Sequence, residues 1–116
     1  ETCGVEILHG YDVEDMTAVE VANRIAKRVG MAKCYFTFDI DCLDPAYAPG
    51  TGTPVAGGPS SAKMLSVLTK LGALDFVGAD IVEVAPAYDH ADITAIAGGS
   101  VAQHYIGLLA QRKVKA

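Results

Sequence analysis

Apolar residues recur every three or four positions in three stretches of the chain, which is the spacing of one buried face of an α-helix. The stretches cover residues 18–29, 61–71 and 93–108. Each follows a residue type that caps helix starts, and the first follows a complete capping box formed by Thr17 and Glu20. The pattern therefore predicts three helices, with these buried positions: Ala18, Val21, Ala22, Ile25 and Val29; Met64, Leu65, Leu68 and Leu71; Ile93, Ile96, Ala97, Val101, Tyr105 and Leu108.

Two shorter segments, residues 33–40 and 74–84, are rich in aromatic and β-branched residues and predict buried strands. A further short strand is expected over residues 5–9. Residues 41–59 are dense in proline and glycine, so we expect a long loop there without helix or strand. Strands that alternate with helices indicate an α/β fold, in which a parallel sheet with flanking helices is joined by right-handed crossovers. Residues 1–116 are predicted to form a single unit.

The predicted sheet is small for strands that look buried on both faces. Three helices can cover such a sheet only in part. The chain is therefore expected to be the edge of a larger α/β domain, or a protomer that must associate with another chain.

Composition narrows the class of protein further. The chain has 116 residues, 51% of them hydrophobic, and a net charge of −5, which excludes disorder and argues against nucleic-acid binding. No uninterrupted apolar run reaches the ~20 residues of a membrane span, and the acidic start does not resemble a signal peptide. Three cysteines without metal-site spacing indicate reduced thiols, so we expect a cytoplasmic protein that binds neither membrane nor nucleic acid.

Acidic residues gather where both predicted strands end. Asp39 and Asp41 stand two positions apart, so in an extended backbone their carboxylates point to the same side. Two like charges so close favour a hard divalent cation such as Mn²⁺ or Mg²⁺, although a turn cap beside a surface salt bridge explains the same pair. Glu83 lies among apolar neighbours at the end of the second strand. It is expected either to meet a cation or to form an internal salt bridge.

Other candidate groups carry weaker signals. The glycine-rich run 48–58 lacks the residues of a phosphate-binding loop. It is expected either to line a small-molecule pocket with the Thr51 and Thr53 hydroxyls or to be a structural crossover. The three histidines lack zinc-site spacing and are read as structural, and Cys42 is a minor candidate for a nucleophile because no histidine lies near it in sequence.

Two ordered motifs are similar to those of a known enzyme family. They are Phe38-Asp-Ile-Asp-Cys-Leu-Asp-Pro45, followed by Ala48-Pro-Gly-Thr-Gly-Thr-Pro54 with Gly57-Gly58, and Val82-Glu-Val-Ala-Pro-Ala-Tyr-Asp89. Together they resemble the ureohydrolases, the family of arginase and agmatinase, and the second motif looks most like its agmatinase branch. The resemblance runs from about residue 33 to the end. It implies the C-terminal part of the arginase-like three-layer α/β/α fold.

The resemblance also implies a reaction and a role for each matched residue. Asp39 and Asp41 match ligands of a binuclear Mn²⁺ site, and Asp41 also matches a group that can take up a proton during catalysis. Thr53 matches a hydroxyl that contacts the substrate, and Glu83 matches the carboxylate that receives the guanidinium. The implied reaction is hydrolysis of agmatine, or of a close linear guanidino compound, to urea and an amine such as putrescine. Family members further suggest a homo-oligomer, a trimer or hexamer.

The sequence departs from the family in the ligands that it lacks. Members carry a histidine and an Asp-x-His-x-Asp run upstream, and His9 is followed by Gly10-Tyr11-Asp12 instead. We therefore expect an incomplete metal site and an inactive isolated chain. Two alternatives stay open: a phosphotransferase with Asp39 as nucleophile and Asp41 as acid/base, and a non-catalytic fragment that acts only as an oligomer partner.

Overall fold

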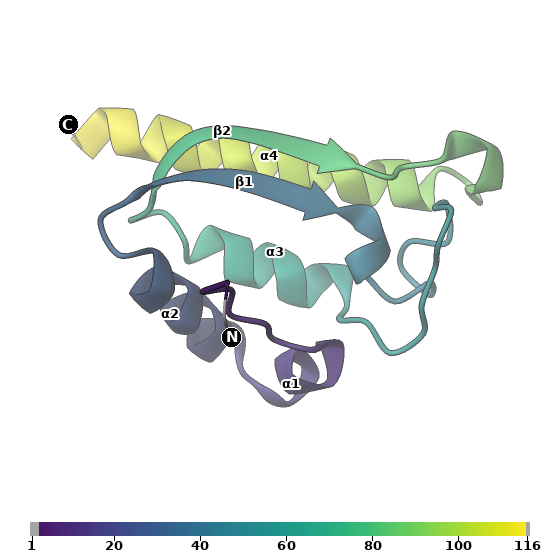
Figure 1. Cartoon of the computed structure of the whole chain (residues 1–116). Coiled ribbons are helices and arrows are strands. Elements are labelled where there is room, and N and C mark those ends of the chain that lie inside the picture. The colour runs from purple at the N-terminus through teal and green to yellow at the C-terminus, as the bar shows by residue number, and fades with distance from the viewer. Residues whose placement is uncertain (1–2, 116) are drawn as a thin grey trace.

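The computed structural model describes residues 3–115, and side chains as far as residue 112. It shows two parallel strands with helices packed beside them, which confirms the predicted α/β class (Figure 1). The elements in chain order are α1 (Gly10–Asp15), α2 (Ala18–Val29), β1 (Lys33–Asp39), the 3-10 turn η1 (Ile40–Cys42), α3 (Ser61–Thr69), β2 (Asp75–Val82), the 3-10 turn η2 (Pro86–Tyr88) and α4 (Ile93–Lys115).

The helix boundaries follow the capping residues. Thr17 accepts the backbone N–H of Glu20, whose own side chain returns to the N–H of Thr17, so the predicted capping box begins α2. Ser60 accepts the N–H of Lys63 and begins α3. Gly30, at φ +60°, closes α2 in a backbone conformation that other residues adopt only with strain.

The sheet is covered on one face. Alternate residues Cys34, Phe36 and Phe38 of β1, with Phe76 and Ile81 of β2, pack against the core. The opposite face is polar and open: the side chains of Tyr35 and Thr37 both donate hydrogen bonds to Asp80 there, while the apolar Val77 is 60% exposed. Successive side chains of a strand point to opposite faces, so among the described residues one face of the sheet packs on the core and the other is exposed. The expectation of strands buried on both faces is therefore wrong for this chain.

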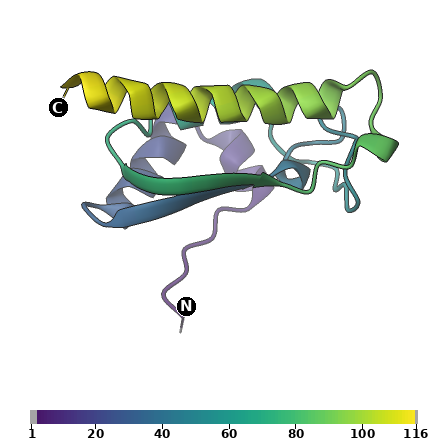
Figure 2. The same cartoon turned by 90° about the horizontal axis from the view of Figure 1, so that it is seen from above.

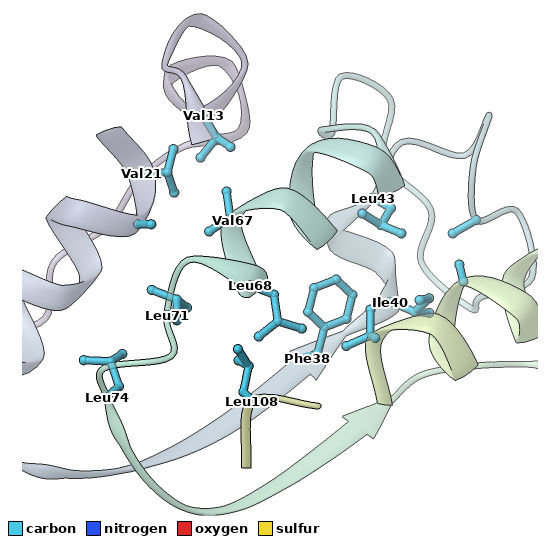
Figure 3. Packing of buried hydrophobic residues seen from close by; sticks show 14 residues of the cluster. Val13, Val21, Phe38, Ile40, Leu43, Val67, Leu68, Leu71, Leu74 and Leu108 are labelled. Carbon is cyan, nitrogen blue, oxygen red and sulfur yellow. The ribbon is translucent and has the colours of Figure 1, made fainter. Parts of the chain in front are cut away.

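Helix α3 lies between the strands and the pair α1–α2, and α4 runs beside the strands along their length (Figures 1 and 2). The core forms where these elements meet (Figure 3). Phe38 of β1 lies beside Leu68 of α3 and Leu108 of α4, and Ile40 of η1 is fully buried next to them. The ring of Phe36 stacks on Tyr105 of α4 at 5.8 Å between centroids. The core thus anchors β1 and η1, the segments that carry Asp39 and Asp41.

The N-terminal segment differs from its prediction. Residues 5–9 form no strand, and a short helix, α1, follows them. Among the described residues this segment pairs with no strand, and the side chains of Val5 and Ile7 are exposed. Instead, Glu6 accepts a 2.5 Å hydrogen bond from Arg24 of α2, which holds the segment against that helix. The loop over residues 41–59 is confirmed, apart from the single turn η1 at its start.

Helix α4 is the longest helix of the described residues and is rich in apolar side chains. Its residues from Ile93 to Arg112 are long and apolar enough, by length and composition, to cross a membrane. The core offers a different explanation, because Ala97, Val101 and Leu108 pack one side of α4 against α3 and β2. Core helices meet the same criterion. Packing on this side accounts for part of the apolar character of α4, because Ile96 and Ile106 are more than 60% exposed. The predicted burial of Ile96 is therefore wrong for this chain.

Candidate functional site

The carboxyl ends of both strands lie at the same end of the molecule (Figure 1). Asp39 is the last residue of β1 and lies opposite Val82, the last residue of β2, so Glu83 follows directly beside it. Ligands of parallel α/β proteins bind beyond this edge, because the loops that leave the strands diverge there. The predicted site residues Asp39, Asp41, Thr53 and Glu83 therefore share one edge of the sheet.

The Asp39–Asp41 pair forms by a different geometry from the one expected. The strand stops at Asp39 and the chain enters the turn η1, so the two residues are not related by extended backbone. Asp39 caps this turn, and its Oδ1 accepts the N–H of Asp41 at 3.1 Å. The turn brings both half-buried carboxylates to the strand end, which preserves the predicted proximity for another reason.

Thr53 reaches this pair from the long loop. Its hydroxyl donates a 2.8 Å hydrogen bond to Oδ2 of Asp41. The loop returns to η1 because the N–H of Gly57 donates to Oδ2 of Asp44 and the N–H of Asp44 donates to Pro59. Thr53 is exposed, so its hydroxyl orients Asp41 from the solvent side of the site.

Thr51, the other predicted pocket hydroxyl, lies elsewhere. Its side chain is 3% exposed, and its hydroxyl has no hydrogen-bond partner among the described residues. It therefore does not line an open pocket in this structure.

Glu83 leaves β2 in a strained conformation. Its φ of +66° lies in the left-handed region, which costs a non-glycine residue of order 1–3 kcal/mol. This kink ends the alternation of β2, so the side chain of Glu83 is exposed at the strand end and not directed into the core. The expected internal salt bridge is absent from the described residues. Such strain at a strand end is typical of functional residues.

Electrostatics favour a cation at this edge. Burial raises the pKa of Asp39, and the negative charges of Asp41 and Glu83 raise it further, while the N–H of Asp41 opposes the shift. Carboxylate oxygens are the ligands that Mn²⁺ prefers, so Asp39 and Asp41 fit this ion in kind. They do not fit it in number, because the described residues contain no group of three or more metal-binding side chains.

The thiol candidate Cys42 lies in η1 next to Asp41, whereas the imidazoles of His9 and His104 lie before α1 and in α4. Packing of protein around its sulfur, together with the charges of Asp39 and Asp41, raises the pKa of Cys42 to about 11, although part of this side chain reaches solvent. The thiol is therefore protonated at neutral pH and is no nucleophile. Nδ1 of His104 hydrogen-bonds the carbonyl of Ser100 within α4, and the ring of His9 stacks on Tyr11 of α1.

Hydrogen bonds among residues to which the sequence analysis assigned no role connect the loops that carry the site. Thr94 is fully buried, and its hydroxyl accepts the N–H of Gly50 at 2.8 Å. The carbonyl of Gly50 accepts the N–H of Ala85. Asp89 accepts three backbone N–H groups at the start of α4. The sequence offered one signal for Thr94, a threonine in the first turn of a predicted helix. Its hydrogen-bond partner Gly50 lies 44 residues away, so the contact itself was not predictable.

A parallel α/β fold with carboxylates at the ends of its strands defines a class of proteins that bind ligands at this edge of the sheet. Comparison with known proteins identifies the family within this class. The family model described as the arginase family matches residues 1–107. The chain belongs to the arginase family. The predicted resemblance to ureohydrolases is thereby confirmed, although the match begins at residue 1 and not near residue 33, and it ends at residue 107. The phosphotransferase alternative loses its basis.

Curated relatives include agmatinases. The agmatinase of Neisseria meningitidis serogroup B is 49% identical over 107 residues, which are 92% of this chain and 35% of that protein. The agmatinase of Proteus mirabilis is 48% identical over 110 residues, 95% of this chain and 36% of that protein. The chain thus spans about a third of the length of the relatives that it matches.

Solved structures give the same result. A hypothetical agmatinase from Burkholderia thailandensis superposes with a TM-score of 0.96 at 52% identity, over 97% of this chain and 36% of that one. Proclavaminate amidino hydrolase from Streptomyces clavuligerus superposes with a TM-score of 0.88 at 37% identity, over 90% of this chain and 35% of that one. The arginase-like fold predicted from the motifs is confirmed.

Proposed function

We propose that this chain is part of an agmatinase-like ureohydrolase, which hydrolyses the guanidino group of agmatine, or of a close linear guanidino compound, to urea and an amine such as putrescine. The observation that carries the proposal is the gathering of Asp39, Asp41, Thr53 and Glu83 at one strand edge in a chain of the arginase family. The relatives named agmatinase favour agmatine over the substrates of other family members.

Glu83 is proposed to bind the guanidinium. A planar guanidinium presents paired N–H donors, which suit a carboxylate through two parallel charge-assisted hydrogen bonds. The exposed position of Glu83 leaves its oxygens free to accept them, and its kinked backbone fixes where they point. Thr53 is placed to contact the same substrate from the facing loop while its hydroxyl keeps Asp41 oriented.

Asp39 and Asp41 are proposed to supply two of the ligands of a binuclear manganese site. Manganese, when bound, would supply Lewis-acid activation of water at neutral pH. A cation there would also relieve the repulsion that raises the pKa of Asp39. Asp41 is further proposed to take up a proton during the reaction, at the carboxylate whose Oδ2 accepts from Thr53.

Because the described residues contain no group of three or more metal-binding side chains, the remaining ligands are proposed to come from elsewhere, and the isolated chain is proposed to be inactive. The part of the family fold that this chain does not match is their proposed source, since the chain covers 36% of the Burkholderia thailandensis protein. A cytoplasmic location and a homo-oligomer, trimer or hexamer, complete the proposal.

The test uses a chimaera of the Burkholderia thailandensis protein, in which this chain replaces the segment that it matches. We expect the manganese-loaded chimaera to release urea from agmatine faster than from guanidinobutyrate or guanidinopropionate. Glu83→Gln should keep its manganese and lose activity, since the amide cannot pair with a guanidinium by charge. Glu14→Gln is the matched control, because Glu14 lies in α1 and contacts Lys63 of α3 on the surface.

Each outcome separates the alternatives. A Glu83→Gln chimaera at the full rate contradicts the role of Glu83. A wild-type chimaera that is folded and manganese-loaded but releases no urea favours the non-catalytic fragment instead.

A further inference from the structure

A buried joint connects the two loops that carry Thr53 and Glu83. Its centre is Gly50, whose N–H donates to the hydroxyl of Thr94 and whose carbonyl accepts the N–H of Ala85, both at 2.8 Å. The side chain of Thr94 is fully buried, so solvent does not compete for this hydrogen bond. Gly50 is thereby tied at once to the start of α4 and to the segment that leaves β2.

The joint leaves no room for a side chain at Gly50. A Cβ at this position would stand 2.7 Å from Cβ of Asp89, which is closer than any real contact. Asp89 itself is fixed: its Oδ1 accepts the N–H groups of His90 and Thr94, and its Oδ2 accepts that of Ala95. Desolvation opposes ionisation there, but these hydrogen bonds prevail and lower the pKa of Asp89 to about 2, so it stays charged.

Gly50 and Ala85 lie close in sequence to the two predicted substrate-binding residues. Gly50 precedes Thr53 by three residues, and Ala85 follows Glu83 by two. Among the backbone hydrogen bonds of the described residues, the one from Ala85 to Gly50 is the one that joins the long loop to the exit of β2. The distance between Thr53 and Glu83 therefore depends on where Thr94 holds Gly50.

We propose that Thr94 is a positioning residue, whose buried hydroxyl fixes Thr53 and Glu83 relative to each other so that both reach one guanidino substrate. This inference rests on the proposed function of those two residues. Thr94 touches no reacting group in this account and acts through Gly50. The backbone of Asp39 and Asp41 is held separately, by β1 and η1, so a change at Thr94 is expected to keep both carboxylates within reach of a metal even where the hydrogen bond from Thr53 to Asp41 loosens.

The experiment compares three variants of the chimaera. Thr94→Val keeps the shape of the side chain and removes the acceptor for the N–H of Gly50. Thr94→Ser keeps that acceptor and is the rescue variant. Thr69→Val is the matched control, because the hydroxyl of Thr69 also bonds a backbone group, the carbonyl of Leu65, at the end of α3.

We expect Thr94→Val to raise KM for agmatine and to lower kcat/KM by about ten- to a hundredfold, which is the cost of misplacing binding groups by up to about 1 Å. Manganese content should stay that of the wild type. Amide hydrogen exchange at Gly50 and Ala85 should quicken by about five- to tenfold, since each loses or loosens a hydrogen bond. Thr94→Ser and Thr69→Val should match the wild type in all three measurements.

Two results would overturn the inference. One is unchanged KM and kcat/KM in a folded Thr94→Val chimaera, and the other is loss of activity with unchanged exchange at Gly50 and Ala85. If the wild-type chimaera releases no urea, the proposed function fails, and the exchange measurement still decides whether Thr94 couples the two loops. Thr94→Ala replaces Thr94→Val if the valine variant does not fold.

Discussion

Gly58 is the residue whose replacement tests most sharply how the long loop packs on the site. A Cβ at Gly58 would lie 2.5 Å from the carbonyl oxygen of Cys42, 2.7 Å from the nitrogen of Asp44 and 2.8 Å from the carbonyl carbon of Leu43. All three atoms belong to the backbone directly after Asp41, so no side chain can rotate away. Gly58→Ala must therefore push the loop off this segment.

The size of the effect follows from these distances. An ordinary carbon–oxygen contact is about 3.4 Å, so the methyl group overlaps by about 0.9 Å with an oxygen that the core holds in place. Overpacking of this kind costs about 1–3 kcal/mol, occasionally more. The shift also stretches the hydrogen bonds from Asp44 to Pro59 and from Gly57 to Asp44. Because Thr53 lies on the same loop, its hydrogen bond to Asp41 should weaken as well.

The assay is urea-induced unfolding of the chimaera, followed by circular dichroism, together with urea release from agmatine. Gly58→Ala should lower the free energy of unfolding by the amount above and reduce activity. Gly52→Ala is the control on the same loop, because its Cβ would meet nothing within 4 Å and its φ is ordinary. Equal stability of the two variants would refute the packing of residues 57–59 against residues 42–44.

Three further predictions concern the core and the titratable groups. Phe38→Ala should cost about 3–5 kcal/mol of unfolding free energy, measured in urea, because a ring packed between α3 and α4 is lost. Without metal, Asp39→Asn should raise Tm at pH 7 and not near pH 3.8. The pKa of Asp39 is raised in the folded chain, so its ionisation at higher pH lowers the stability of the wild type, and the amide avoids that loss. A gain in Tm at the lower pH and not at pH 7 would contradict the raised pKa. Iodoacetamide should label Cys42 of the native chain at pH 8 roughly a hundredfold more slowly than in urea; equal rates contradict its raised pKa.

The helices and strands could be predicted because their signals are local. The capping box at Thr17, the glycine at position 30 and the apolar spacing of α2 and α3 each act within a few residues. The segment 5–9 failed for the same reason. Its alternation is typical of a strand, but pairing needs a neighbouring edge, and alternation cannot report whether one is present.

The sequence named the residues that the structure brings together at the strand ends, and their roles there are proposals. The motifs placed Asp39, Asp41, Thr53 and Glu83 in one family pattern, and the structure brings them to one edge. Their geometry was not predictable, because the turn η1 and the positive φ of Glu83 break the extended backbone that the argument assumed. The burial of Thr51 depends likewise on contacts between distant segments, which no local pattern encodes.

The most direct test of the account is the manganese content per chain, measured by elemental analysis after reconstitution and desalting. The account predicts about two ions per chain in the chimaera, as in two-metal hydrolytic sites, and close to none in the isolated 116-residue chain. Asp39→Asn and Asp41→Asn should each reduce the content of the chimaera. About two ions in the isolated chain, or an unchanged content in both variants, would contradict the claim that these carboxylates supply part of a site completed elsewhere.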